Sequence, residues 1–185
     1  HAPGFKLDDA TAFIAWHNTI YAHCLAAEAI RKADPDAKIG MAPTGRICTP
    51  ATDSPADIAA ARAATFAVAD GEWTFTYTMS LDPLCGRGWP NVAGGQVQRV
   101  LDAIPQEQLD ALPLGKLDFL GMNIYNSIAV RAGADGKPEF CTRPAGHPRT
   151  AIGWPITPEA MEWGPRFVHE RYGLPIFITE NGLSC

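Results

Sequence analysis

Several features are missing from this sequence, and their absence excludes classes of protein and of partner. Its 185 residues contain no apolar run of about 18, so no membrane-spanning helix is expected. Lys and Arg form no cluster and the net charge is −5, which argues against nucleic acid and anionic membranes as partners. Internal repeats, low-complexity segments and a signal peptide are also absent. The composition, with 46% apolar residues, indicates a soluble globular protein.

The cysteines and histidines follow no ligand pattern. The five cysteines are widely spaced, odd in number and free of Cys-x-x-Cys pairs, so we interpret them as reduced thiols of a cytoplasmic protein. A zinc site is the alternative, but the spacing typical of zinc ligands is missing. His17 and His23 do not face each other on a helix, and His169-Glu170 lacks the second histidine of a metalloprotease motif. We therefore predict no metal and no cofactor.

What the sequence does contain is an alternation of helix and strand patterns. Asp8-Asp9 predicts one helix N-terminus, and Ser54-Pro55 predicts another, because serine caps helices and proline suits the first helical position. The helical patterns cover residues 8–31, 54–69, 97–103, 106–112 and 157–172. The strand patterns cover residues 38–43, 117–125 and 175–180.

The remaining segments give weaker signals. Thr and aromatic residues over 73–81 favour a strand by propensity, and 82–90 indicates a loop. Gly, Pro and charged residues are spread over 126–156, which predicts one long loop, and a loop of that length is usually functional. Gly164-Pro165 should bend or break the last helix.

The order of the elements predicts an α/β fold. Helices between consecutive strands imply parallel strands joined by right-handed crossovers. Three such strands fit either the middle of an open sheet or an arc of a barrel, and periodicity does not distinguish the two. In both architectures, ligands bind where the strands end.

Polar residues stand at the ends of two of these strands. Glu180 ends an apolar strand, and Asn123 and Tyr125 lie two residues apart, so their side chains share one face. A tyrosine hydroxyl donating to the Glu180 carboxylate would keep it ionised, as a nucleophile requires. Spacing alone fits a structural role even better, in which Glu180 caps a turn and the other two satisfy core hydrogen bonds.

The residues at the end of the last predicted strand resemble those of a known family. Ile178-Thr179-Glu180-Asn181-Gly182 resembles the nucleophile motif of glycoside hydrolase family 1, the β-glucosidase family. Further segments are similar to the same family in the same order, and together they span essentially the whole chain. These segments are His1–Gly4, Ala22-His23, Asp118–Tyr125, and Gly153–Pro158 followed by Arg171–Pro175.

The resemblance implies a retaining β-glycosidase of the β-glucosidase type, built on a (β/α)8 TIM barrel. Residues 1–185 would be part of its single catalytic domain, about strands five to seven with the intervening helices, and incomplete at both ends. Glu180 would be the nucleophile that forms a glycosyl-enzyme ester, Tyr125 would orient it, and Asn123 would line the sugar subsite. Trp89, in a Gly-rich loop, is a weaker candidate for sugar contact.

Parts of the family's site have no counterpart in this chain. No segment matches the Thr-Phe-Asn-Glu-Pro stretch that carries the acid/base glutamate. Retaining hydrolysis needs two carboxyls about 5 Å apart, and this chain supplies only the attacking one. Asp82, Asp118 and Glu159 are better explained as turn, strand-start and helix-start residues. We therefore expect these residues alone to be inactive.

The expected partner is a small carbohydrate, of the β-glucoside or cello-oligosaccharide type. A homo-oligomer of the full-length enzyme stays open. One alternative is a non-catalytic carbohydrate-binding relic or a truncated inactive fragment, in which Glu180 only hydrogen-bonds a sugar. Another is an unrelated α/β enzyme that binds nucleotides, but no Gly-rich phosphate loop follows a strand.

Overall fold

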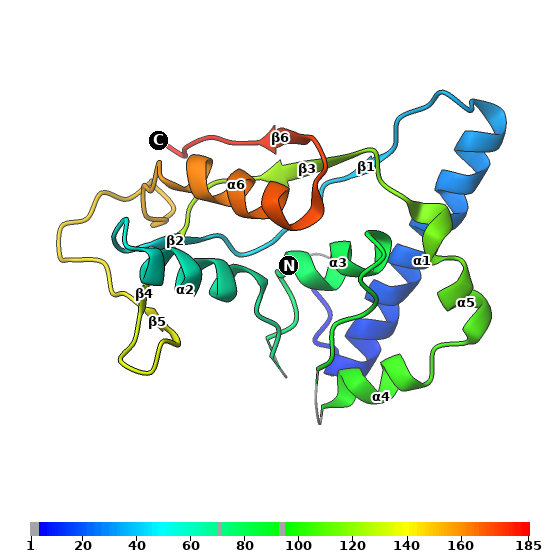
Figure 1. Ribbon diagram of the computed structural model, residues 1–185, viewed down its shortest axis with the longest axis horizontal. Helices are drawn as coiled ribbons and strands as arrows, with labels where there is room; N and C mark the ends of the chain where they lie inside the picture. Colours follow the sequence, from blue (N-terminus) through cyan, green and yellow to red (C-terminus); the bar gives the residue numbers. More distant parts are fainter. Residues whose placement is uncertain (1–3, 70–71, 93–94) are drawn as a thin grey trace. The chain divides into compact units, whose positions relative to one another are not determined.

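The computed structural model describes residues 4–69, 72–92 and 95–185 (Figure 1). By their internal contacts these residues form two compact units. The helical unit comprises His1–Ile39, Val68–Thr74 and Thr78–Leu117, and the sheet unit comprises Gly40–Ala67, Phe75–Tyr77 and Asp118–Cys185. That all of them belong to one domain, incomplete at both ends, stays a prediction.

The helical unit is organised around α1 (Asp9–Ala33), which begins and ends close to the predicted bounds. The Asp8 carboxylate accepts a hydrogen bond from the Thr11 amide over 2.9 Å and so caps the helix. The buried side of α1 follows helical spacing through Phe13, His17 and Ile20. This unit also contains most of α3 (Tyr77–Leu84), together with α4 (Gln96–Asp102), α5 (Gln106–Asp110) and the short 3-10 helix η1 (Leu112–Gly115).

The strand expected over 73–81 is wrong, because the chain forms the helix α3 (Tyr77–Leu84) there. Thr and Tyr favour strands by local propensity, but burial decides here. Every residue of α3 is buried, and Pro83, expected in a loop, lies inside its last turn. Trp73, just before the helix, packs edge-on against Phe13 with ring centroids 5.4 Å apart.

The sheet unit contains the predicted parallel strands, in the order β1 (Gly40–Met41), β3 (Phe119–Asn123) and β6 (Ile176–Glu180). Both pairings are parallel. Gly121 allows the strands to approach closely, because a Cβ there would lie 2.6 Å from the Ala42 Cβ and 2.9 Å from the Thr179 Cγ2. The expected parallel arrangement is confirmed.

The single long loop expected over 126–156 is wrong. It contains β4 (Ile128–Ala132) and β5 (Pro138–Phe140), an antiparallel hairpin whose first strand pairs in parallel with β2 (Cys48–Pro50). The pairing of Cys48 with Ile128 joins residues far apart in the sequence, so no local pattern indicates it. Only residues 141–156 remain largely without regular structure.

The strands β2, β4 and β5 form a second sheet. Two helices pack on it, α2 (Pro55–Phe66) and α6 (Ala160–Tyr172). Ser54 caps α2 as predicted, accepting from the Asp57 amide over 3.1 Å. A break of α6 at Pro165 is wrong, since the helix is continuous through it. Trp163 and Phe167 on either side of the proline are both held in the same buried cluster, which offsets the lost backbone hydrogen bond. None of the helices in the described residues is long and apolar enough to cross a membrane.

Candidate active site at the ends of β3 and β6

The candidate site lies where β3 and β6 end. Asn123 is the last residue of β3, Glu180 is the last residue of β6, and the two are paired in the sheet. The register shifts between Met122 and Asn123: Met122 pairs with Ile178, but Asn123 pairs with Glu180. The regular pairing of the two strands is therefore interrupted just before they end. Beyond them, the Ile124 amide still donates to the Glu180 carbonyl over 2.9 Å.

The predicted contact between Tyr125 and Glu180 is present. The Tyr125 hydroxyl donates to the Glu180 Oε2 over 2.5 Å. This hydrogen bond raises the pKa of Tyr125 above its ordinary value of 10.0, with smaller contributions from burial and from the carboxylate charge. The protonated phenol is the donor. The hydrogen bond is therefore fully present below about pH 10 and is lost as the pH rises through the raised pKa.

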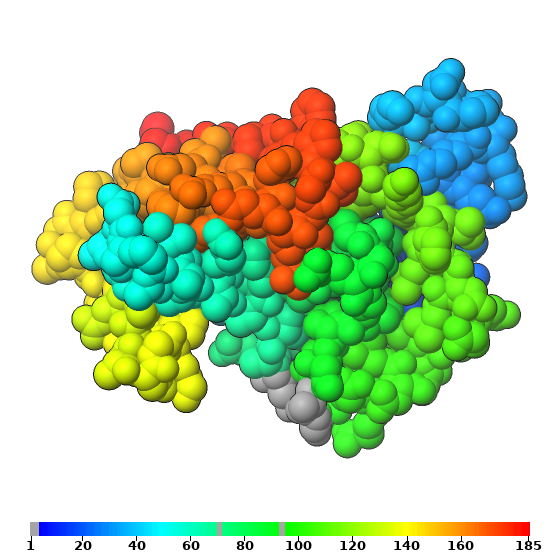
Figure 2. Space-filling model, in the orientation of Figure 1, coloured from blue at the N-terminus to red at the C-terminus, as the bar shows by residue number. Residues whose placement is uncertain are grey.

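Asn123 lies beside this pair but its carbonyl oxygen is already engaged. The Thr179 hydroxyl donates to the Asn123 Oδ1 over 2.7 Å, which fixes the orientation of the amide. Glu180 itself is exposed, and the C-terminal segment that carries it (red in Figure 2) lies at the molecular surface. The structure thus brings together Glu180, Tyr125 and Asn123, three of the four predicted site residues.

Trp89 is the fourth, and it lies in the helical unit. Its ring packs edge-on against Phe13, with centroids 5.4 Å apart, and against the His17 ring, with centroids 5.7 Å apart. It is half-buried next to the hydrophobic cluster around Phe13. Packing therefore accounts for most of its position, and sugar contact by Trp89 stays a prediction.

A different tryptophan borders the candidate site. The Trp154 ring lies 5.5 Å from the Tyr125 ring, measured between centroids, and it is 44% exposed. Together with Ile152 and Leu183 they line a hollow of about 370 Å³. Sequence reasoning singled out Trp89 instead, although the place of Trp154 in the Gly153–Pro158 segment was a signal that could have identified it.

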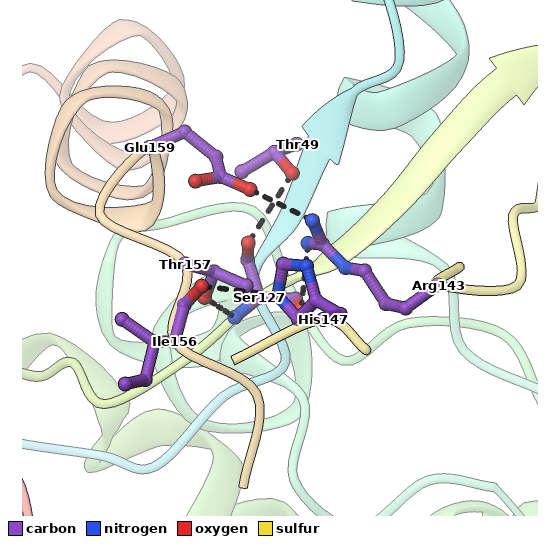
Figure 3. A network of polar contacts seen from close by, with 7 residues as sticks. All are labelled: Thr49, Ser127, Arg143, His147, Ile156, Thr157 and Glu159. Atoms are coloured by element: carbon purple, nitrogen blue, oxygen red, sulfur yellow. Dashed lines mark hydrogen bonds and ion pairs between the residues drawn. The ribbon is translucent and has the colours of Figure 1, made fainter. Parts of the chain in front are cut away.

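Buried and partly buried polar contacts hold the two loops that carry Tyr125 and Trp154 (Figure 3). The Ser127 amide donates to the Thr157 Oγ1 over 2.8 Å, and the Ser127 and Thr49 hydroxyls lie 3.2 Å apart. Arg143 forms an ion pair with Glu159 over 3.1 Å and donates to the Ser127 carbonyl over 3.4 Å. Sequence reasoning missed this network, because its members have ordinary local roles and meet only in the folded chain.

Within the residues that the structure covers, no three His, Cys, Asp or Glu side chains are grouped to hold a metal ion. The five cysteines, all in described segments, are free thiols. Burial raises the pKa of the Cys48 thiol to about 11. A thiol in that state is a poor nucleophile at neutral pH.

Comparison with known proteins identifies the family. The model of glycosyl hydrolase family 1 matches residues 1–185. β-Glucosidase A of Thermotoga maritima is 30% identical over 187 residues, covering 100% of this chain and 40% of the relative. A β-glucosidase of an Agrobacterium species is 31% identical, covering 98% of this chain and 39% of its own length. The chain thus spans about two fifths of the curated relatives it matches.

The solved structures agree with this fold. A β-glucosidase from Thermotoga maritima in complex with glucoimidazole superposes with a TM-score of 0.68 at 32% identity, covering 99% of this chain and 39% of that one. The predicted fold class, part of a (β/α)8 barrel, is therefore confirmed. The segment His1–Pro3, part of the resemblance, lies outside the described residues. The match over the whole sequence, together with the fold and the strand-end carboxylate, shows that this chain belongs to glycosyl hydrolase family 1.

Proposed function

We propose that this chain is part of a retaining β-glycosidase of the β-glucosidase type in which Glu180 is the nucleophile. The observation that carries the proposal is the Tyr125 hydrogen bond to the Glu180 Oε2 at the ends of adjacent parallel strands. A hydroxyl that donates to one carboxylate oxygen orients the group and leaves its other oxygen available for attack. Barrel enzymes place catalytic groups at this end of their strands.

In the proposed reaction, the free Glu180 oxygen attacks the anomeric carbon of a β-glycoside. A carbon–oxygen bond to the carboxylate forms as the bond to the leaving group breaks, and a second carboxyl protonates the leaving oxygen. Water then hydrolyses the ester, with that second group acting as base. We assign the second role to no acid of this chain, so another segment of the enzyme must supply it.

The other residues of the site would bind and orient the substrate. Asn123 is held by Thr179 at the end of β3, and its amide nitrogen would donate to a sugar hydroxyl. Trp154 offers a half-exposed aromatic face beside Tyr125, a surface suited to stacking on a sugar ring or an apolar leaving group. The substrate class we propose is β-glucosides and cello-oligosaccharides. A cytoplasmic location and a homo-oligomer stay predictions.

The assignment is tested by trapping the covalent intermediate. The test uses a chain that carries residues 1–185 within a complete family 1 domain, called below the full-length enzyme. A 2-deoxy-2-fluoro-β-glucoside with a good leaving group should form a stable ester on Glu180, because the fluorine slows hydrolysis of the ester. Peptide mass spectrometry would locate it.

The Glu180→Gln variant should show no label, and it serves as the matched control. Labelling of another carboxylate would remove Glu180 as nucleophile. Absence of any label with sugar still bound would favour the non-catalytic carbohydrate-binding relic.

A second prediction concerns Tyr125. In the full-length enzyme, Tyr125→Phe removes the hydrogen bond but keeps the ring on Trp154. The carboxylate that loses this donor is no longer held in one orientation. We expect kcat to fall by about tenfold or more, with a smaller change in KM. An unchanged kcat would show that the Tyr125 hydroxyl does not support the carboxylate.

A further inference from the structure

Asn181, the residue after Glu180, makes a contact that the proposed mechanism does not use. Its side-chain Nδ2 donates to the Ile124 carbonyl over 2.7 Å. The same Nδ2 lies 3.6 Å from the Met161 sulfur, in the first turn of α6. One amide therefore connects the segment after β6 to the segment after β3 and to the start of α6.

The Ile124 peptide is thereby held on both sides. Its amide donates to the Glu180 carbonyl over 2.9 Å, and its carbonyl accepts from the Asn181 side chain. Since β6 ends at Glu180, the side chain of Asn181 continues the pairing for one step beyond the strand. The Ile124 side chain is 1% exposed, so this segment is also fixed by packing.

The position of this peptide determines where Tyr125 lies. Ile124 is flanked by Asn123 and Tyr125, the two residues of this segment assigned to the site. A short hydrogen bond is sensitive to small displacements of either partner. A clamp on the Ile124 carbonyl therefore acts directly on the distance between the Tyr125 hydroxyl and Glu180.

We propose that Asn181 is a positioning residue, whose amide holds the Ile124 carbonyl and thereby keeps the Tyr125 hydroxyl on the Glu180 carboxylate. The effect on turnover rests on the proposed function, whereas the effect on Tyr125 does not. Asn181 need not touch the substrate. Because the contact is made by a side chain and not by the backbone, a substitution can remove it directly.

The test uses Asn181→Ala and Asn181→Ser in the full-length enzyme. Both remove the side-chain amide; Ala leaves no side-chain donor, and Ser keeps a hydroxyl on a shorter side chain. We expect kcat to fall by about 10- to 100-fold with little change in KM, the size of loss that small misplacements of catalytic groups produce. Without substrate, the Tyr125 pKa should fall toward its ordinary value near 10. That titration is obtained by subtracting the curve of the Tyr125→Phe variant.

Met161→Leu is the matched control, because it removes the sulfur acceptor and keeps the volume; it should leave kcat and the Tyr125 pKa unchanged. A double-mutant cycle of Asn181→Ala with Tyr125→Phe should give losses in kcat that are clearly less than additive, because both changes disrupt the same contact.

An unchanged Tyr125 titration in the Asn181 variants, or additive losses in the cycle, would overturn the proposal, even if the melting temperature falls. If trapping labels a different carboxylate, the proposed function fails while the titration still decides the role of Asn181.

Discussion

Replacing Glu180 by Gln in the full-length enzyme is expected to lower kcat for aryl β-glucosides by more than about a thousandfold. Gln keeps the shape of the side chain and an oxygen that can accept from the Tyr125 hydroxyl, so the geometry at the strand ends should survive. What it removes is the negative charge and the nucleophilic oxygen, without which no ester can form. Steady-state kinetics together with a melting curve would measure both consequences.

Glu107→Gln is the matched control for this change. Glu107 is an exposed residue in the first turn of α5, and the same substitution there should leave kcat within about twofold of the parent enzyme. If Glu180→Gln retained more than about a tenth of the activity, then the carboxylate would not be the nucleophile, and its contact with Tyr125 would have only a structural meaning.

The second large effect concerns residues 1–185 expressed by themselves, which should be aggregated or molten and should hydrolyse no β-glucoside. Within the described residues, β1 and β6 are the two edges of their sheet. On β6, Phe177 is 58% and Ile178 is 40% exposed. Each large apolar side chain left in water forgoes roughly 1.5–3 kcal/mol of burial, which is a sizeable part of a domain's stability of about 5–15 kcal/mol.

Size-exclusion chromatography, dye binding to exposed apolar surface and denaturant unfolding would test this expectation. A Phe177→Lys, Ile178→Thr double variant provides the control, because a charged edge strand resists pairing with another chain. It should aggregate less but remain inactive. A monomeric, cooperatively unfolding polypeptide of these residues with glucosidase activity would contradict both the stability argument and the need for a second carboxyl.

Where the sequence carried a helix-capping signal, the structure agrees with it. Asp8 and Ser54 cap their helices through short-range hydrogen bonds, and Gly173 ends α6 in a left-handed conformation at φ 69°. These contacts span three residues or fewer, or depend on a single backbone angle, so they are visible in the sequence itself. The order of strands and helices likewise predicted the parallel sheet.

Prediction from the sequence failed for two segments whose secondary structure depends on contacts with distant parts of the chain. The segment 73–81 has strand propensity, but from Tyr77 onward it belongs to the helix α3, every residue of which is buried. The segment 126–156 reads as a loop but contains β4, which exists through its pairing with β2. Propensity is a weak preference, and burial and pairing with distant segments override it.

The candidate site divides in the same way. The sequence by itself determined the family, the carboxylate at the end of β6, and the expectation that Tyr125 would reach it, since parallel strands end at a common edge. Only the tertiary structure placed Trp154 beside Tyr125, tied Ser127 to Thr157, and set the Asn181 amide on the Ile124 carbonyl. The physical reason is that strand periodicity sets the direction of a side chain within its own strand, whereas the loops beyond the strands meet through contacts between segments 29 to 57 residues apart, for which no local pattern exists.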